Sequence, residues 1–233
     1  DLIRRSLKGE TFISTDDDFE KVESWHHGHV DAVLQAMKRL GFERLISGRK
    51  CKERDIVIAM IVGRILEPDN EMSSKLANTR WWDVTTMPSI LNLHGVGEDD
   101  LYDAMDWLLK RQAAIEKKMS AHHLSDGGIV LYDLTSSYFE GVTCPLAARG
   151  HNRDGKKGKL QVNYGLLTDK DGRPVSVSVF PGNTLDHQSL MFQAEKIKNQ
   201  FKIGEMVLVG DRGMITQKLI DEKLRDIKGI DWI

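Results

Sequence analysis

The sequence is poor in cysteine and lacks long apolar runs, and these absences exclude several classes of protein. Its 233 residues contain two cysteines, Cys51 and Cys144, which lie far apart and form no CxxC pair. A disulfide framework or a structural zinc site is therefore not expected. No apolar run approaches the roughly 20 residues that a membrane-spanning helix needs, and the N-terminal DLIRRSLKGE has no signal-peptide pattern. We expect a cytoplasmic protein with no membrane partner.

An excess of either charge is also missing. The chain has 33 Lys and Arg residues against 35 Asp and Glu residues, for a formal net charge of -2. Residues 126–233 hold 15 basic and 14 acidic residues and sum to +1, so the remainder sums to -3. Neither part is expected to bind polyanions through bulk charge alone. The hydrophobic content of 40% is enough for one large domain or two modest ones.

The first half of the chain has the periodicity of helices. Residues 27–42 carry apolar residues at helical spacing, and Gly41 ends the pattern. Residues 53–68 are apolar nearly all round, as in the central helix of a helical core, and Pro68 ends them. Residues 98–119 predict one long helix with acids in its first turn and lysines in its last. Between these last two, residues 75–98 predict only a short helix and a loop.

The second half changes to short β-branched runs that predict strands. These are IVLYDL, LQVNYGLLT, PVSVSVF and EMVLVG. DKDGR, residues 169–173, is a tight turn that makes the second and third runs an antiparallel hairpin. A helical pattern at 186–201 separates the third run from the fourth. We therefore expect an α/β fold with a helical region at 1–125 and a mixed sheet with flanking helices at 126–233.

Two of these strands lead directly to an acidic residue. IVLY precedes Asp133, and MVLVG precedes Asp211. If the strands are parallel neighbours, their carboxyl ends lie about 5 Å apart, at the edge of the sheet where ligands usually bind. Two close carboxylates repel unless a cation or a shared proton intervenes, and Mg²⁺ favours oxygen ligands. The pair predicts a metal site for phosphoryl transfer, unless each acid only caps the turn that follows.

A basic, glycine-containing segment, RGHNRDGKKGKLQ, lies between the two acids in the sequence. Such a segment is typical of loops that follow phosphate backbones, although many charged runs are only solvated surface. Arg212, beside Asp211, could hold a phosphate or pair with an acid. The candidate DNA-binding residues are Arg149, Arg153, Lys156, Lys157, Lys159 and Arg212.

Three stretches resemble, in order and spacing, the catalytic core of DDE transposases of bacterial insertion sequences, specifically the IS-four-like group. They are LYDLTSSYFEG, GHNRDGKKGKLQVNYGLLTDKDGRPVSVSVFPGNTLDHQSL and VLVGDRGM. The helical patterns before them are similar to the N-terminal helical region of that group. The resemblance therefore extends over nearly the whole chain.

The resemblance implies an RNase H-like catalytic fold, two divalent metal ions (Mg²⁺ or Mn²⁺), and cutting and joining of DNA at the ends of a mobile element. By position, Asp133 and Asp211 correspond to the first two acids of the catalytic triad and to metal ligands. The family's third acid, a Glu in a Tyr-Arg-Glu-Lys type motif on a later helix, has no match here. We therefore expect the sheet domain to be partial and this chain alone to be nearly inactive.

Further implications of the resemblance are a bacterial cytoplasmic location, element-end and target DNA as partners, and a homo-oligomer. The helical region would contribute to binding of the DNA ends and to dimer contacts. The main alternative is a truncated, non-catalytic transposase that acts as a DNA-binding or regulatory protein.

Other candidate sites carry weaker signals. His26, His27 and His29 cluster before a helix without a fourth zinc ligand. Asp186, or Thr184 before it, is expected to cap the helix that begins there. A haloacid dehalogenase-like phosphohydrolase would need Asp-x-Asp in its first motif, where Thr135 stands instead. The remaining nucleophile candidates lack a His–Asp relay and are interpreted as packing or turn residues: Thr135, Ser136, Ser137 and Cys144.

Overall fold

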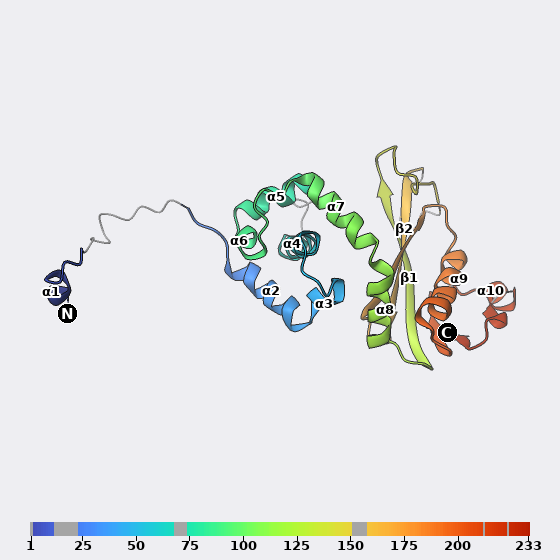
Figure 1. The fold of residues 1–233 in the computed structure, drawn as a ribbon. Coiled ribbons are helices and arrows are strands. Elements are labelled where there is room, and N and C mark those ends of the chain that lie inside the picture. Colours follow the sequence, from blue (N-terminus) through green and yellow to red (C-terminus); the bar gives the residue numbers. More distant parts are fainter. Residues whose placement is uncertain (1, 12–22, 68–73, 151–157, 212, 223) are drawn as a thin grey trace. The chain divides into compact units, whose positions relative to one another are not determined.

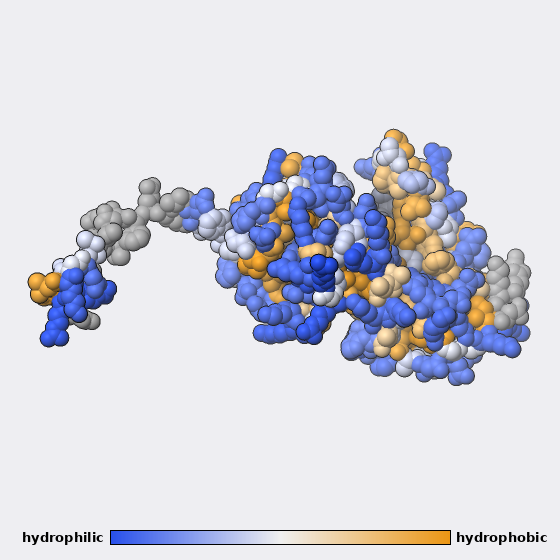
Figure 2. All heavy atoms as spheres, viewed as in Figure 1, coloured by the Kyte–Doolittle hydropathy of each residue, from blue (hydrophilic) through white to orange (hydrophobic). Residues whose placement is uncertain are grey.

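The protein divides into two compact units. The structure is a computed structural model that describes residues 2–11, 23–67, 74–150, 158–211, 213–222 and 224–233. The first unit, Asp1–Leu109, is helical and is called the helical unit; the second, Lys110–Ile233, contains the sheet and is called the sheet unit (Figure 1). On the face seen in Figure 2, both units are mostly hydrophilic, with apolar residues scattered among the polar ones.

The helical unit is built around α4 (Lys52–Leu66). The run from Ile56 to Ala59 is buried without interruption, so this helix is covered on several sides, as its all-round apolar sequence predicts. It packs with Trp82 and Leu101 in one core. None of the described helices is long and apolar enough to span a bilayer. The other helices of the unit are α1 (Leu2–Ser6), α2 (Gly28–Arg39), α3 (Phe42–Ile46), α5 (Lys75–Asp83), α6 (Met87–Leu91) and α7 (Glu98–Leu109).

The single helix predicted at 98–119 is wrong, because the chain forms two helices there. α7 ends at Leu109, and α8 (Gln112–His123) begins after a turn at residues 110 and 111. α7 buries Leu101 in the core of the helical unit, whereas α8 buries Glu116 against the sheet. The helical periodicity continues through the turn, and no Gly or Pro marks it. Tertiary packing therefore divides what local sequence presents as continuous.

Because α8 packs on the sheet, the division between the units falls between residues 109 and 110. The boundary drawn from the sequence, at 125 and 126, lies after this helix.

The sheet unit confirms the expected mixed α/β architecture, a mixed sheet with flanking helices. Its strands lie in the order β3-β2-β1-β4-β5, with β1, β2 and β3 antiparallel and β4 and β5 parallel to β1. The predicted hairpin between β2 and β3 is confirmed. The elements are β1 (Gly128–Phe139), β2 (Leu160–Asp169), β3 (Pro174–Pro181), α9 (Asp186–Lys196) with a π-helical turn (Ile197–Phe201), β4 (Met206–Val209), α10 (Gln217–Glu222), a 3-10 turn (Leu224–Asp226) and β5 (Ile230–Trp232).

One face of this sheet forms the core. Successive side chains along a strand point to opposite faces of the sheet, so Val130, Tyr132 and Leu134 of β1 point together into one layer. They pack with Leu190 and Ala194 of α9, which are fully buried. The helices after β3 and β4 thus cover this packed face.

The opposite face is called the open face, because its side chains remain accessible. It carries Asp133 of β1, Leu166 of β2 and Val177 of β3. Leu166 lies between the other two and pairs with Asp133 on one side and with Val177 on the other. Leu166 and Val177 are 41% and 45% exposed, although both are apolar.

A buried ion pair joins α8 to the packed face. Glu116 Oε2 lies 2.8 Å from Lys196 Nζ on α9, and the two side chains are 7% and 10% exposed. Ser176 Oγ and the backbone N–H of Val177, both on β3, donate to Glu116 Oε1 at 3.0 Å and 3.2 Å. Gln112 donates to the carbonyl oxygen of Val177 at 2.8 Å. Side chains of α8 therefore satisfy the outer backbone groups of the edge strand β3 and protect that edge.

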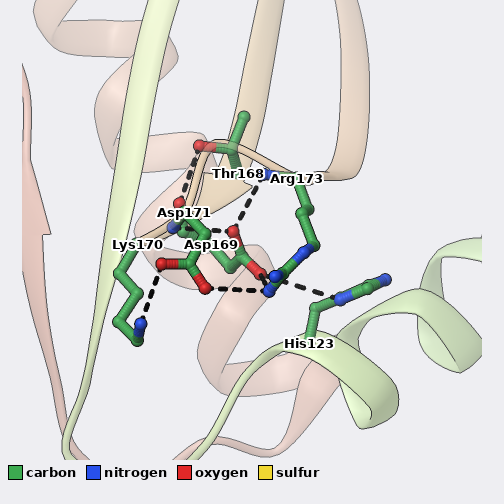
Figure 3. A network of polar contacts seen from close by, with 6 residues as sticks. All are labelled: His123, Thr168, Asp169, Lys170, Asp171 and Arg173. Carbon is green, nitrogen blue, oxygen red and sulfur yellow. Dashed lines mark hydrogen bonds and ion pairs between the residues drawn. The ribbon is translucent and has the colours of Figure 1, made fainter.

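A second polar cluster holds the end of α8 to the turn between β2 and β3 (Figure 3). Asp169 accepts hydrogen bonds from the backbone N–H groups of Asp171 and Arg173 at 2.9 Å and 2.8 Å, and from Arg173 Nη1 at 3.2 Å. His123 Nδ1 of α8 lies 3.7 Å from the same carboxylate. Gly172 completes the turn at φ 79°, a conformation that favours glycine. Burial raises the pKa of Asp169, but these hydrogen bonds and the Arg173 charge together lower it below its ordinary value.

Removing one partner of the buried ion pair should be strongly destabilising. Lys196→Ala leaves Glu116 buried and unpaired, which costs about 3–5 kcal/mol in comparable cases. Urea unfolding of the full chain, followed by circular dichroism, measures this loss. The control is Lys117→Ala, which removes an exposed lysine of α8 and should change the midpoint little. Equal midpoints for the two variants would contradict a structural role for the pair.

The turn cluster should make stability depend on pH in the acid range. A carboxylate with a lowered pKa in the folded state stabilises the fold above its unfolded pKa, and this contribution disappears as the pH falls through the folded value. Asp169→Asn should therefore lower the melting temperature at pH 7, and its difference from wild type should shrink below about pH 4. Melting curves between pH 7 and pH 2 test this, with Glu195→Gln on α9 as an exposed control. A difference that stays constant with pH would refute it.

Candidate functional site

Asp133 lies inside β1 and not at its end, which corrects the expectation from the sequence. β1 continues to Phe139, because β2 pairs with it from Val130 to Phe139. The other neighbour, β4, pairs only as far as Leu131, which lies opposite Val209. Asp133 therefore stands where β1 loses its parallel partner.

The two candidate acids lie just beyond the paired region of the parallel strands β1 and β4, Asp133 within β1 and Asp211 after the end of β4. Asp133 follows Leu131 by two residues, and Asp211 follows Val209 by two residues, while Leu131 and Val209 are register partners. Adjacent strands are about 4.8 Å apart, and a step of two residues returns to the same face. Asp133 therefore lies on the open face, and Asp211 follows the carboxyl end of β4, the strand beside β1. Both residues are exposed.

Backbone hydrogen bonds organise the chain at both acids. The N–H of Leu134 donates to Asp133 Oδ1 at 2.8 Å. The carbonyl oxygen of Asp211 accepts from the N–H groups of Met214 and Ile215 at 2.8 Å and 3.0 Å, so a turn begins at this residue. Asp211 thus caps the turn with its backbone, and its carboxylate can face a ligand.

Within the described part of the chain, no group of three or more His, Cys, Asp or Glu side chains could hold a metal ion together. This observation covers the three N-terminal histidines. The ring of His27 is hydrogen-bonded through Nδ1 to Thr86 Oγ1 at 2.9 Å, and His26 and His29 make an edge contact with ring centroids 5.6 Å apart. Both contacts are of the kind that stabilise the fold of the helical unit.

The basic segment begins and ends at a pair of backbone hydrogen bonds. Ala148 and Gln161 exchange N–H to carbonyl bonds of 3.1 Å and 2.9 Å. Gly182, which follows β3, packs so closely here that a Cβ atom would collide with the carbonyl oxygen of Gln161. Arg149 and Lys159 flank this closed base, and both are exposed.

The base of the segment lies toward the same end of the sheet but beyond the candidate acids, because Gln161 is the register partner of Tyr138. Tyr138 is five residues past Asp133, or roughly 17 Å along β1. Lys159 Nζ also lies 3.0 Å from Glu140 Oε1 in an exposed ion pair. The other predicted DNA-binding residues lie outside the described residues: Arg153, Lys156, Lys157 and Arg212.

A buried polar cluster beneath this end of the sheet was not anticipated from the sequence. Ser136 Oγ donates to Asn163 Oδ1 at 2.8 Å, and Asn163 Nδ2 donates to the carbonyl oxygen of Thr184 at 3.2 Å. Gln161 Nε2 donates to the carbonyl oxygen of Gly182 at 2.9 Å. The cluster fixes the loop between β3 and α9. Polar residues at alternate, inward positions of LQVNYG were the available signal.

The start of α9 differs from the expected cap. Leu185 is the residue before the helix, and Asp186 is its first residue. Gln188 Oε1 accepts a hydrogen bond from the backbone N–H of Leu185 at 3.2 Å. A side chain from within α9 therefore satisfies a backbone N–H group at the start of the helix. Neither Asp186 nor Thr184 therefore stands at the N-cap. The side chain of Tyr132 on β1 is buried, and this burial raises the pKa of its hydroxyl group.

A small polar pocket lies at the other end of the sheet, around His122, His123 and Arg173. Its two carboxylates, Asp169 and Asp171, are already paired with Arg173 at 3.2 Å and 2.8 Å. An additional cation would have to displace these partners. This pocket is therefore better explained as part of the attachment of α8.

Comparison with known proteins finds a likeness to solved structures. No family model matches the chain, and no curated protein matches it. Among solved structures, the chain is similar to one described as "Mos1 transposase paired-end complex with left transposon end". The two share 11% sequence identity with a TM-score of 0.31, and the match covers 93% of this chain and 69% of that one.

Proposed function

We propose that this chain is a transposase that binds DNA and takes part in metal-dependent cleavage and strand transfer at the ends of an insertion sequence. The observation that carries the proposal is that Asp133 and Asp211 each follow, by two residues, one member of the Leu131–Val209 register pair of the parallel strands β1 and β4. Asp211 follows the carboxyl end of β4, and Asp133 lies on β1 beside that end, at the kind of edge where α/β sheets bind ligands. The basic segment at the same end of the sheet supplies cations for a polyanion.

The two acids suit a hard divalent cation. Mg²⁺ is commonly held by one or two carboxylates together with substrate phosphates, and it keeps several waters. Asp133 and Asp211 would hold Mg²⁺ or Mn²⁺ in this way. The bound ion would supply Lewis-acid activation of the phosphodiester and stabilise charge on the attacking and leaving oxygens. No covalent nucleophile from the chain is needed.

The side chains that flank the basic segment would place the DNA. Arg149 and Lys159 are adjacent to residues held to the sheet through the Ala148–Gln161 pair, so their charges lie at a defined point beyond the acids along β1. Such contacts set position and affinity but read no sequence. The basic residues outside the described part of the chain belong to the same proposal through the sequence alone: Arg153, Lys156, Lys157 and Arg212.

A second function is DNA binding without cleavage. It is favoured by the finding that, among the described residues, no third acidic or histidine side chain joins the pair to complete a metal site. A site with two carboxylates holds a cation less firmly than one with three. Such a chain would occupy DNA ends or assemble with an active relative.

Metal binding should require both acids. Isothermal titration of Mn²⁺ should give binding to the wild type, and Asp133→Asn or Asp211→Asn should weaken it by about tenfold or more, since each removes a charged oxygen ligand. Asp231→Asn is the matched control, because Asp231 is an exposed acid opposite Val207 on the neighbouring strand. If all four proteins titrate alike, the two acids do not form the metal site.

The basic segment should contribute a measurable salt dependence. Each phosphate contact on duplex DNA adds roughly 0.9 to the slope of log K against log salt concentration. The double variant Arg149→Ala with Lys159→Ala should therefore lower that slope by about 1.8 if both residues contact phosphates. Fluorescence anisotropy at several salt concentrations measures it. Lys117→Ala with Lys228→Ala removes the same charge from other exposed positions, and an equal effect there would refute a specific path for the DNA.

A further inference from the structure

The open face has a polar side and an apolar side next to the candidate acids. On β1, Asp133, Thr135 and Ser137 follow one another on this face, and all three are exposed. Across from them, β2 presents Leu166 opposite Asp133 and Tyr164 opposite Thr135.

The apolar side continues onto β3. Val177 lies opposite Leu166, and Val179 lies opposite Tyr164. The exposed fractions of these four side chains are 36% for Tyr164, 41% for Leu166, 45% for Val177 and 48% for Val179. Apolar side chains grouped on an accessible surface commonly mark a binding site.

Tyr164 is the aromatic residue of this group and lies near Asp133. It is two residues from Leu166, the partner of Asp133, and such diagonal neighbours are about 7–8 Å apart. An aromatic ring at this distance can reach the nucleotide next to one whose phosphate lies at the acids. The hydroxyls of Thr135 and Ser137 are of the type that donates to phosphate oxygens.

The separation of the open face into a polar side and an apolar side fits a DNA strand better than it fits a protein. A single strand presents phosphates along one side and flat apolar bases along the other. The hydroxyls of β1, with Arg149 and Lys159 at the same end of the sheet, complement the phosphates. The aromatic and aliphatic side chains of β2 and β3 complement the faces of the bases.

We propose that Tyr164 is a stacking platform for an unpaired base of the DNA strand whose phosphate lies at Asp133 and Asp211. The substrate class is thereby narrowed to DNA ends that are single-stranded or locally unpaired at this nucleotide. The inference rests on the proposed function and adds a base-binding residue to it.

The experiment uses the full chain in Ca²⁺, a hard cation for carboxylate oxygens. Duplexes with a single-stranded extension carry 2-aminopurine, whose fluorescence falls when it stacks on an aromatic ring. Wild type should quench the probe and should prefer the extended duplex to a blunt one. Tyr164→Ala should abolish the quenching and weaken binding of the extended duplex by about 5- to 150-fold, the range found for loss of one stacked base.

Matched variants separate stacking from other effects. Tyr164→Phe keeps the ring and should behave like wild type, whereas Tyr164→Leu keeps bulk without aromaticity and should lose the quenching even if the alanine variant unfolds. Tyr102→Ala removes another exposed tyrosine, on α7, and should leave both readouts unchanged.

The outcomes distinguish this inference from the proposed function. If wild type binds blunt and extended duplexes equally and Tyr164→Leu quenches as wild type does, the stacking platform is refuted while DNA binding stands. If wild type binds neither duplex, the proposed function fails as well. A change in oligomeric state in Tyr164→Leu, without a change at the probe, would assign the open face to a protein partner and overturn the inference.

Discussion

The pairing of β1 with β4 is the constraint on which the candidate site depends. Only four residue pairs, from Gly128 with Met206 to Leu131 with Val209, join these strands. They bring residues almost 80 positions apart in the sequence into one register. The same pairing buries Val130 and Leu208 on the packed face, leaves Asp133 on the other face, and brings the end of β4, which Asp211 follows, beside β1. Burial of apolar side chains thus stabilises the strand pairing on which the candidate site depends.

The attachments at the two ends of the sheet are of different kinds. At one end, α8 is held by the buried Glu116–Lys196 pair and by the Asp169 turn, in which each carboxylate is matched by a positive partner. Toward the other end, Asp133 is exposed, and so is Arg149, which follows the hydrogen-bonded backbone pair of Ala148 and Gln161. Satisfied charges stabilise a fold, whereas accessible charges on a rigid support are available to a ligand. This contrast is the physical reason for proposing a ligand site where β1 continues past the end of β4.

Local patterns predicted the elements well where a single element determines its own surroundings. The all-round apolar sequence of α4 and the DKDGR turn between β2 and β3 are examples. Prediction failed where contacts with residues distant in the sequence determine the secondary structure. Examples are the break between α7 and α8 and the extension of β1 to Phe139. The acids at 133 and 211 were proposed as a pair from the sequence, and the pair remains a prediction. The position of Asp133 inside β1 was not foreseen, because it depends on the pairing of β1 with β2. The Asn163 cluster was missed since its partners are mostly backbone carbonyls of a distant loop.

The two-residue period of β1 makes the core and the site mutually dependent. A slip of one residue in its pairing would turn Asp133 toward Leu190 and bring Tyr132 to the surface. Burying an unpaired carboxylate in an apolar layer costs several kcal/mol or forces it to take up a proton. The alternative register is therefore opposed twice, by lost apolar burial and by the desolvated charge. An acid in the middle of a strand consequently helps to specify the register of the sheet, in addition to any part it takes in binding a metal.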